Sequence, residues 1–126
     1  MRIEEYLARI KSLIISSEVI GSYQIREEVI KEQEGYIRVK ANLINDDILE
    51  LMEYIVLEKN QAQIKKYSFH WQKEDGTLVK RWDNVVHHPE VANFPYHVHI
   101  GEDRIETSKE MNTETTLEII TQELGS

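Results

Sequence analysis

The side chains best suited to chemistry are concentrated in one stretch of the sequence. That stretch holds all five histidines, both tryptophans and both prolines, at His70, Trp71, Trp82, His87, His88, Pro89, Pro95, His97 and His99. Histidine is the side chain whose ordinary pKa lies nearest neutrality, so such a group can transfer protons, bind a metal ion or form a polar structural cluster. We therefore expect function to lie between Tyr67 and Gly101.

A hairpin centred on Asp75-Gly76 predicts which of these side chains share a face. An Asp-Gly pair between two alternating segments is a hairpin signal, and a loop of two or four residues places His70 opposite Arg81. The same register gives the pairs Ser68–Asp83, Phe69–Trp82, Trp71–Lys80 and Gln72–Val79. Because successive strand residues point to opposite faces, the polar side chains then share one face and the aromatic side chains share the other.

The polar face carries the groups that phosphodiester cleavage needs. His70 can serve as general base or acid, Arg81 can bind the charge that develops on the phosphate, and Asp83 can orient the imidazole. If they are exposed, the aromatic side chains can stack on bases of RNA, and a lysine lies beside them. The candidate RNA contacts are therefore Tyr67, Trp71, Trp82 and Lys80. The alternative is structural, with Asp83 in a cross-strand ion pair, His70 hydrogen-bonded nearby and the aromatic rings in the core.

A second grouping of histidines suits a metal ion. His97 and His99 are two residues apart, so a strand would point both to the same side. The residues that could complete a ligand set are His87, His88, Glu90 and Asp83. The chain has no cysteine and no His-Glu-x-x-His pattern. The alternative to a metal site is that these histidines hydrogen-bond to one another and to nearby groups in an irregular segment. We expect no metal and no cofactor.

The composition is that of one ordinary globular domain. The chain has 126 residues, 40% hydrophobic and 30% charged, and no apolar run approaches the roughly 20 residues of a membrane span. The first residues lack the pattern of a signal peptide, so we expect a cytoplasmic protein with a single domain over residues 1–126. The net charge of −8 argues against general electrostatic binding of nucleic acid, although residues 61–84 carry more basic than acidic side chains.

The elements that position these side chains can be predicted from periodicity. Apolar residues recur at helical spacing from about Ile3 to Glu18, and a period of two follows from Ser22 to Leu43 around a turn at Glu34-Gly35. Further strands are expected over residues 48–57, 63–72 and 77–84, with a short edge strand over 97–100. A capping-box pattern starting at Thr115 indicates a C-terminal helix. The prediction is an α+β fold with an N-terminal helix, an antiparallel meander of about five or six strands and a short C-terminal helix.

The histidine-bearing stretch also resembles the signature of a known family. The residues that carry the resemblance are Tyr67 to Gln72, Gly76, Arg81 to Asn84, His87 to Glu90, Phe94-Pro95, His97, His99 and Gly101. They are similar to the motif of the TumE family, which comprises toxin components of toxin–antitoxin pairs, usually encoded beside a helix-turn-helix antitoxin. The chain departs from that motif at Val85-Val86, where Ala-Pro is expected, and at Tyr96, where the family often has another histidine.

The resemblance implies a TumE-like domain that inhibits growth and is neutralised by a helix-turn-helix antitoxin. By analogy with other small α+β toxins, it also implies action on RNA. Our first hypothesis is a metal-independent ribonuclease in which His70 is a general base or acid, Arg81 binds phosphate and Asp83 orients one of them. The second proton carrier or phosphate contact would be one of three residues, namely His88, His97 or His99.

Two other hypotheses stay open at this point. The first is a metal-dependent hydrolase or nucleotide-modifying enzyme built on His88, His97 and His99. The second is a non-enzymatic interaction module, in which the histidine-rich stretch is a structural or protein-binding surface. RNA and a second copy of the chain are further candidate partners.

Overall fold

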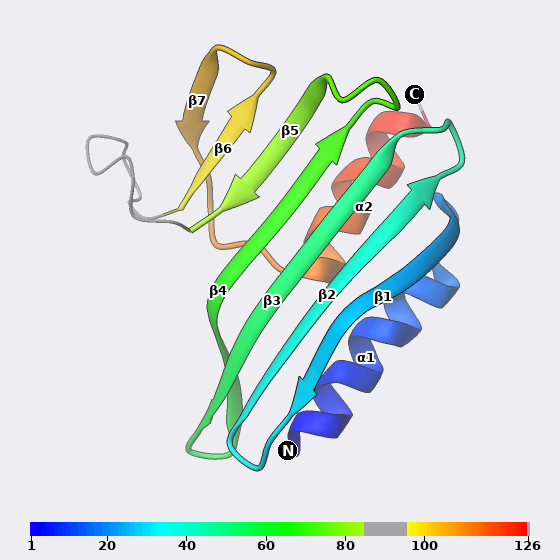
Figure 1. Ribbon diagram of the computed structural model, residues 1–126. Coiled ribbons are helices and arrows are strands. Elements are labelled where there is room, and N and C mark those ends of the chain that lie inside the picture. The colour runs from blue at the N-terminus through cyan, green and yellow to red at the C-terminus, as the bar shows by residue number, and fades with distance from the viewer. Residues whose placement is uncertain (85–95, 126) are drawn as a thin grey trace.

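The computed structural model describes residues 1–84 and 96–125, which form an antiparallel sheet and two helices (Figure 1). The helices are α1 (Ile3–Ser16) and α2 (Thr113–Leu124). The strands are β1 (Ile20–Ile30), β2 (Glu34–Leu43), β3 (Ile48–Glu58), β4 (Gln61–Gln72), β5 (Leu78–Asp83), β6 (His97–Ile100) and β7 (Arg104–Thr107). They lie in the sheet in chain order, each antiparallel to the next, so the sheet is a meander.

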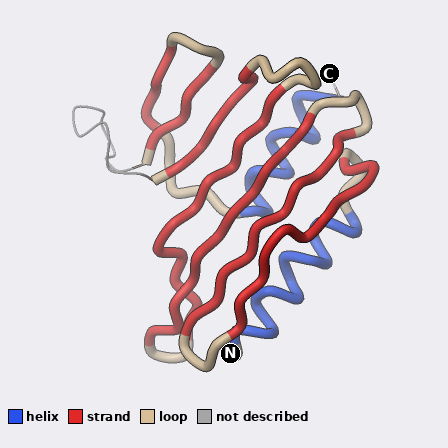
Figure 2. Tube along the Cα trace, viewed as in Figure 1, coloured by secondary structure: helices blue, strands red, loops and turns tan. Residues whose placement is uncertain are grey.

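Both helices lie against the same face of the sheet (Figures 1 and 2). We call this the helix-covered face, and the opposite side the open face. α1 forms because apolar residues recur every three or four positions, and the residues of its apolar stripe are all buried: Ile3, Leu7, Ile10 and Ile14. The prediction that this helix belongs to the core is confirmed. Within the described ranges, no helix has both the length and the hydropathy needed to cross a membrane.

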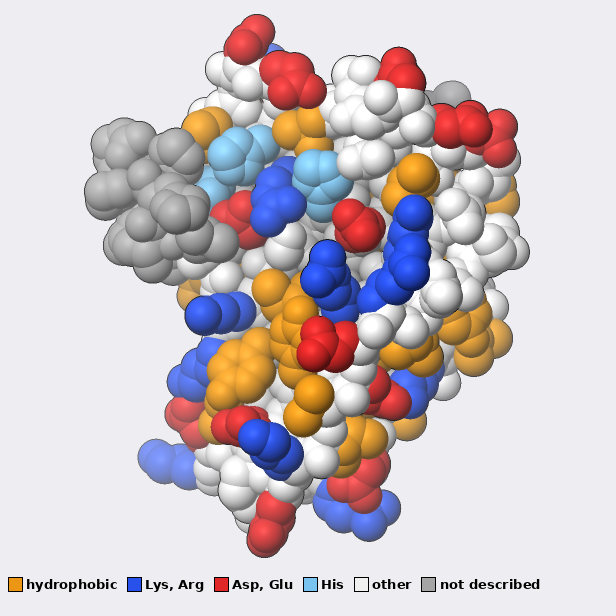
Figure 3. Space-filling model, viewed as in Figure 1, with side chains coloured by type: hydrophobic (Ala, Val, Ile, Leu, Met, Phe, Trp, Pro, Cys, Tyr) orange, Lys and Arg blue, Asp and Glu red, His pale blue; other side chains and the backbone are white. Residues whose placement is uncertain are grey.

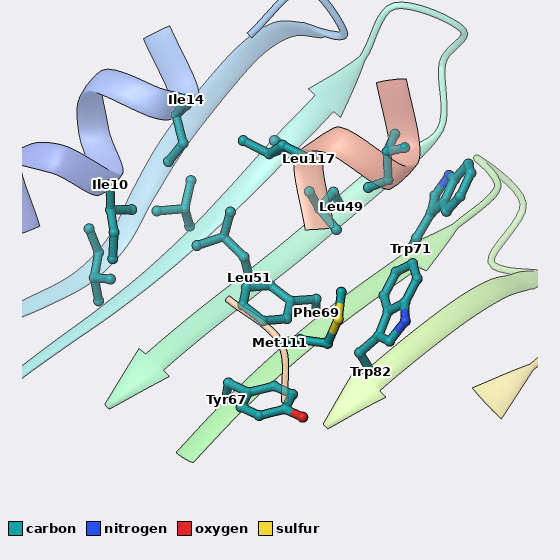
Figure 4. Packing of buried hydrophobic residues seen from close by; sticks show 14 of the residues in the cluster. Ile10, Ile14, Leu49, Leu51, Tyr67, Phe69, Trp71, Trp82, Met111 and Leu117 are labelled. Carbon is teal, nitrogen blue, oxygen red and sulfur yellow. The ribbon is translucent and has the colours of Figure 1, made fainter. Parts of the chain in front are cut away.

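The core lies between the helices and every second residue of the central strands. Alternation of buried and more exposed residues is regular through β2 and most of β3. In the middle of the sheet, the rings of Phe69 and Trp82 lie beside Met111, two residues ahead of α2, and Tyr67 and Trp71 extend the aromatic cluster along β4 (Figure 4). Large aromatic side chains bury about 150–250 Å² each, so this region contributes much of the hydrophobic stabilisation.

One carboxylate is fully buried between the sheet and the helices. Glu53 of β3 accepts hydrogen bonds from the backbone nitrogen of Thr113 at 2.9 Å, from Thr113 Oγ1 at 2.6 Å and from the Tyr6 hydroxyl. These bonds join α1, β3 and the first turn of α2, whose N–H groups have no partner inside the helix. Burial raises the pKa of Glu53 even though the bonds from Thr113 and Tyr6 lower it. Burial and the nearby Glu53 also raise the pKa of Tyr6.

The hairpin between β4 and β5 has the predicted register over most of its length. The confirmed pairs are Ser68–Asp83, Phe69–Trp82, His70–Arg81 and Trp71–Lys80. The predicted pair Gln72–Val79 is wrong, because a bulge after Trp71 places Leu78 opposite Gln72. Gly76 has a φ of 95° in the connecting turn, a conformation that glycine adopts at little cost. The predicted assignment of the polar residues to one face therefore holds.

Four further details of the elements differ from the prediction. The sheet has a seventh strand, β7, whose sequence gives a weak signal because Ile105 is its one apolar residue. As a result, β6 is an interior strand between β5 and β7 and not an edge strand. The N-cap of α2 is Asn112 and not Thr115, and the Asn112 side-chain oxygen accepts a hydrogen bond from the Thr115 nitrogen at 2.8 Å. α1 ends at Ser16, slightly before the predicted end at Glu18.

Candidate functional site

The open face carries a cluster of ionisable side chains across β4, β5 and β6. Strand pairing places Arg81 opposite both His70 and His99, and Asp83 opposite His97. Because these positions have the same parity, their side chains lie on the same face of the sheet. We call His70, Arg81, Asp83, His97 and His99 the histidine cluster. Figure 3 shows histidine side chains gathered around a basic side chain on this face.

Arg81 is held from two sides at the centre of the cluster. Its Nε donates a hydrogen bond to Asp83 Oδ2 at 2.9 Å, and its Nη1 lies 3.1 Å from Nδ1 of His70. The side chain is nevertheless 35% exposed, so part of the guanidinium can meet a ligand. A guanidinium already fixed by two partners has little rotamer freedom left to lose, which prepares it to bind an anion.

The contact with Arg81 determines the tautomer of His70. A guanidinium has five N–H donors and no acceptor, so Nδ1 of His70 must accept the hydrogen bond. The ring proton is then on Nε2, which donates to Gln72 Oε1 at 3.1 Å. In this arrangement His70 is a neutral imidazole whose lone pair is directed at Arg81.

Asp83 is shared between Arg81 and His97. Its Oδ1 lies 2.8 Å from Nε2 of His97, while its other oxygen accepts the bond from Arg81. Asp83 and His97 are buried, at 4% and 2% exposed. A carboxylate in this position holds the imidazole in place. His99 is less buried, and its ring lies edge-on to that of His97 with the ring centroids 5.1 Å apart.

Three residues of the cluster also have the arrangement of metal ligands. The ligand atoms of Asp83, His97 and His99 all lie within 4.8 Å of one another. One carboxylate with two imidazoles is a donor set found in catalytic zinc and non-haem iron sites. Asp83 was one of several residues that the sequence offered to complete a site with His97 and His99.

The structure brings together five residues that the sequence singled out as catalytic, namely the whole histidine cluster. The sixth, His88, lies in the range 85–95, outside the described residues, as do His87 and Glu90. The alternation of strand residues and the Asp75-Gly76 turn were sufficient to find the part of the cluster on β4 and β5.

A hollow of about 230 Å³ adjoins the histidine cluster on the open face. Its walls include Tyr36 and Arg38 of β2, Glu50 and Met52 of β3 and Ser68 of β4, and it shares His70 and Arg81 with the cluster. Sequence reasoning did not single out Arg38 and Glu50, which line this hollow. Alternation does place them on the polar side of their strands, but only the register across β2, β3 and β4 brings them beside Ser68.

The four residues expected to contact RNA lie on the other side of the sheet. Tyr67, Trp71 and Trp82 are at most 4% exposed under the helices, so no base can stack on them, and the expectation of stacking is corrected in favour of the core alternative. Trp71 Nε1 is used inside the protein, where it donates to Asp47 Oδ2 at 2.8 Å. Lys80 forms an ion pair with Glu123 of α2. The physical reason is that rings of this size are the groups a sheet gains most by burying.

Residues 10–124 match the family model described as Toxin TumE, so the match runs from within α1 to the end of α2. No curated protein and no solved structure matches the chain. The matched range contains the histidine cluster and the hollow, and it confirms the resemblance carried by the stretch from Tyr67 to Gly101. The chain therefore belongs to the TumE family, the toxin components of toxin–antitoxin systems.

Proposed function

We propose that this toxin is a metal-independent ribonuclease whose active site is the histidine cluster. The observation that carries the proposal is the position of Arg81, which is held between Asp83 and His70 while its side chain stays 35% exposed. A guanidinium fixed in this way can bind the phosphate of an RNA backbone in one orientation. Groups able to carry protons stand on both sides of it, because His70 and His99 are its partners on the two neighbouring strands.

The two flanking histidines suit the two proton transfers of RNA cleavage. The 2′-oxygen attacks phosphorus while the bond to the 5′-oxygen breaks, which leaves a 2′,3′-cyclic phosphate and a 5′-hydroxyl. A base must take the proton of the 2′-hydroxyl, and an acid must protonate the leaving 5′-oxygen. Nδ1 of His70 accepts from Arg81 in the free protein and suits the base once the bound phosphate takes over that Arg81 donor, whereas His99, when protonated, suits the acid.

Two buried residues, Asp83 and His97, support Arg81 and the two histidines that flank it. Both are buried, so we assign them the role of positioning other groups and not direct proton exchange with the substrate. Asp83 holds Arg81 through one oxygen and His97 through the other, and this fixes the guanidinium where negative charge develops on the phosphate. His88 stays a candidate proton carrier from the sequence.

The antitoxin would act by covering the site. The histidine cluster lies on the sheet face opposite the two helices (Figure 1), where the Arg81 side chain is 35% exposed, so a helix-turn-helix antitoxin laid across Arg81 would exclude RNA. The net charge of −8 confines favourable contacts with RNA to local basic groups, among them Arg38, Lys40 and Arg81 on the open face. A partner that covers these few cations removes the main electrostatic attraction for the substrate.

A second candidate is a metal-dependent hydrolase at the same place. The observation in its favour is the convergence of Asp83, His97 and His99, whose ligand atoms lie within 4.8 Å of one another. A divalent cation there would activate a water molecule and would replace the acid–base role of His70. The two candidates differ in their response to chelators, which makes them separable.

Expression in cells and cleavage by purified protein test the proposal together. Wild type, His70→Ala and Arg81→Ala would be induced while growth and the integrity of total RNA are followed, and purified proteins would be given RNA in the presence of EDTA. The control is Arg104→Ala, because Arg104 pairs with Glu106 two residues on at 2.9 Å, as Arg81 does with Asp83. Arg104 lies on β7, away from the cluster's central strand.

We expect wild type and Arg104→Ala to arrest growth and to cleave RNA in EDTA, and we expect both site variants to lose growth arrest and cleavage. Undiminished cleavage by His70→Ala would remove His70 from the mechanism. Cleavage that EDTA abolishes and manganese or zinc restores would favour the metal-dependent candidate. Growth arrest with intact RNA in every protein would point to an interaction module instead.

A further inference from the structure

The hollow beside the histidine cluster presents polar groups that the described residues leave unused. Glu50 is half-buried, yet its side chain forms no hydrogen bond or ion pair within residues 1–84 and 96–125, although Lys40 lies directly opposite it. Arg38 and Ser68 likewise have no such partner in the described part of the chain. Several other surface cations, by contrast, are paired with carboxylates. An acceptor and two donors therefore meet at one hollow with free hydrogen-bonding capacity.

We propose that this hollow is a base subsite that selects guanine next to the scissile phosphate, which deepens the ribonuclease function proposed above and rests on it. A carboxylate only accepts hydrogen bonds, and a guanidinium only donates them. Guanine offers two neighbouring donors, N1–H and the N2 amino group, on one edge and two acceptors, O6 and N7, on the adjacent edge. The other three bases do not present a pair of donors beside a pair of acceptors, so Glu50 and Arg38 together match guanine alone.

The register of β2 and β3 places Arg38 and Glu50 where they can contact adjacent edges of one guanine ring system. Arg38 is opposite Met52, and Glu50 is two residues from Met52 on the same face, so Arg38 and Glu50 are diagonal neighbours. Such neighbours stand about 7–8 Å apart, within reach of two long side chains that share a ligand. Tyr36 and Met52 line the same hollow and provide an aromatic ring and an apolar surface for the base.

The size and position of the hollow suit one base. Its volume of about 230 Å³ is below the roughly 300–1,000 Å³ of sites that take drug-sized ligands. It shares His70 and Arg81 with the histidine cluster, so a base held there has its own phosphate group beside Arg81. We therefore expect cleavage to fall next to guanosines.

Nucleotide binding tests the subsite without requiring cleavage. Wild type, Glu50→Gln and Glu118→Gln would each be titrated with the 3′-monophosphates of guanosine, adenosine, cytidine and uridine by isothermal calorimetry. Glu118 is an exposed carboxylate on α2, so the control removes the same charge on the opposite side of the sheet. The same proteins would be given short single-stranded RNAs with one guanosine at varied positions. Equal thermal midpoints of the two variants would show that both are folded.

We expect wild type and Glu118→Gln to bind the guanosine nucleotide roughly ten to a hundred times more tightly than the others, the range for a good bidentate contact. Glu50→Gln should lose that preference and keep its affinity for the other three, because a carboxamide accepts through one oxygen only. Equal affinity for all four nucleotides in wild type would overturn the proposal, as would an unchanged preference in Glu50→Gln.

The two readouts separate the subsite from the ribonuclease function. Guanine preference in binding with no cleavage of any RNA would contradict the ribonuclease function and support the subsite. Cleavage without base preference, together with equal nucleotide affinities, would support the ribonuclease function and overturn the subsite. Cleavage beside guanosine in wild type that becomes unselective in Glu50→Gln would support both.

Discussion

Replacing Glu53 by alanine removes the acceptor that links both helices to the sheet. Two donors of Thr113, its backbone N–H and its hydroxyl, lose their partner, and they bond Glu53 at 2.9 and 2.6 Å in the intact protein. A buried donor left without a partner costs roughly 1–3 kcal/mol. The expected loss in the free energy of unfolding is therefore about 2–6 kcal/mol, a large part of the 5–15 kcal/mol typical of a domain.

Replacing Glu53 by glutamine removes the charge of the side chain and keeps its shape. The amide oxygen can still accept from Thr113, and its nitrogen can donate to the Tyr6 oxygen, so the hydrogen-bond link survives. Burial raises the pKa of Glu53 in the folded protein. The raised pKa adds to the free energy of unfolding in full when the pH is below the ordinary glutamate pKa of about 4.3. This contribution is lost as the pH rises through the pKa that Glu53 has in the folded protein. The glutamine variant lacks this dependence, so its stability should improve relative to wild type as pH rises.

Urea unfolding followed by tryptophan fluorescence measures both effects, since Trp71 and Trp82 are buried in the folded protein. Wild type, Glu53→Ala, Glu53→Gln and the exposed control Glu118→Gln would be compared from about pH 4 to neutrality. A loss of less than about 1 kcal/mol in the alanine variant would refute the hydrogen-bond argument. A difference between wild type and Glu53→Gln that is the same at every pH would refute the argument from burial.

Three further substitutions have definite expected outcomes. Asn112→Ala removes the cap on the Thr115 nitrogen and should lower the free energy of unfolding by about 1 kcal/mol in chemical denaturation, with RNA cleavage unchanged. Gly35→Ala would place a Cβ 2.6 Å from Ile3 Cγ2, so the Ile3 side chain or the start of α1 must move, and we expect a loss of about 1–3 kcal/mol with faster hydrogen exchange in α1. Arg81→Lys keeps the charge but cannot span two partners, so cleavage should fall about a hundredfold or more while stability changes by less than about 1 kcal/mol. Cleavage at the wild-type rate in that variant would contradict the role given to the fixed guanidinium.

Much of the fold could be predicted because its connections are short and its strands alternate. The Asp75-Gly76 turn fixed the pairing of β4 with β5, and a shift by one residue would have moved every polar side chain to the core. β7 could not be predicted, since its one apolar residue, Ile105, lies among polar ones. The strand forms by pairing with β6. The bulge after Trp71 depends on the packing of the finished sheet and gives no local signal.

The site was predicted in part, for a related reason. Residues on one hairpin, such as His70 and Arg81, can be paired from a turn, whereas Arg38 and Glu50 meet only through the registers of three strands. A bulge between Tyr54 and Ile55 and a turn with positive φ at Lys59 and Asn60 affect the register of β3 with β4. The sequence also shows which aromatic residues share a face, but the docking of both helices decides that this face is the buried one.

The order of the strands determines the order in which the residues of the candidate site can assemble during synthesis. In a meander each strand pairs with the one made just before it, so the sheet can grow from β1 as the chain leaves the ribosome. His97 and His99 arrive with β6, and α2, which covers Trp71 and Trp82, arrives last. An interrupted product that ends before β6 would lack two of the cluster's three histidines and much of its core. Under the proposed ribonuclease mechanism, a chain truncated before β6 would not cleave RNA, and cleavage would require nearly complete translation.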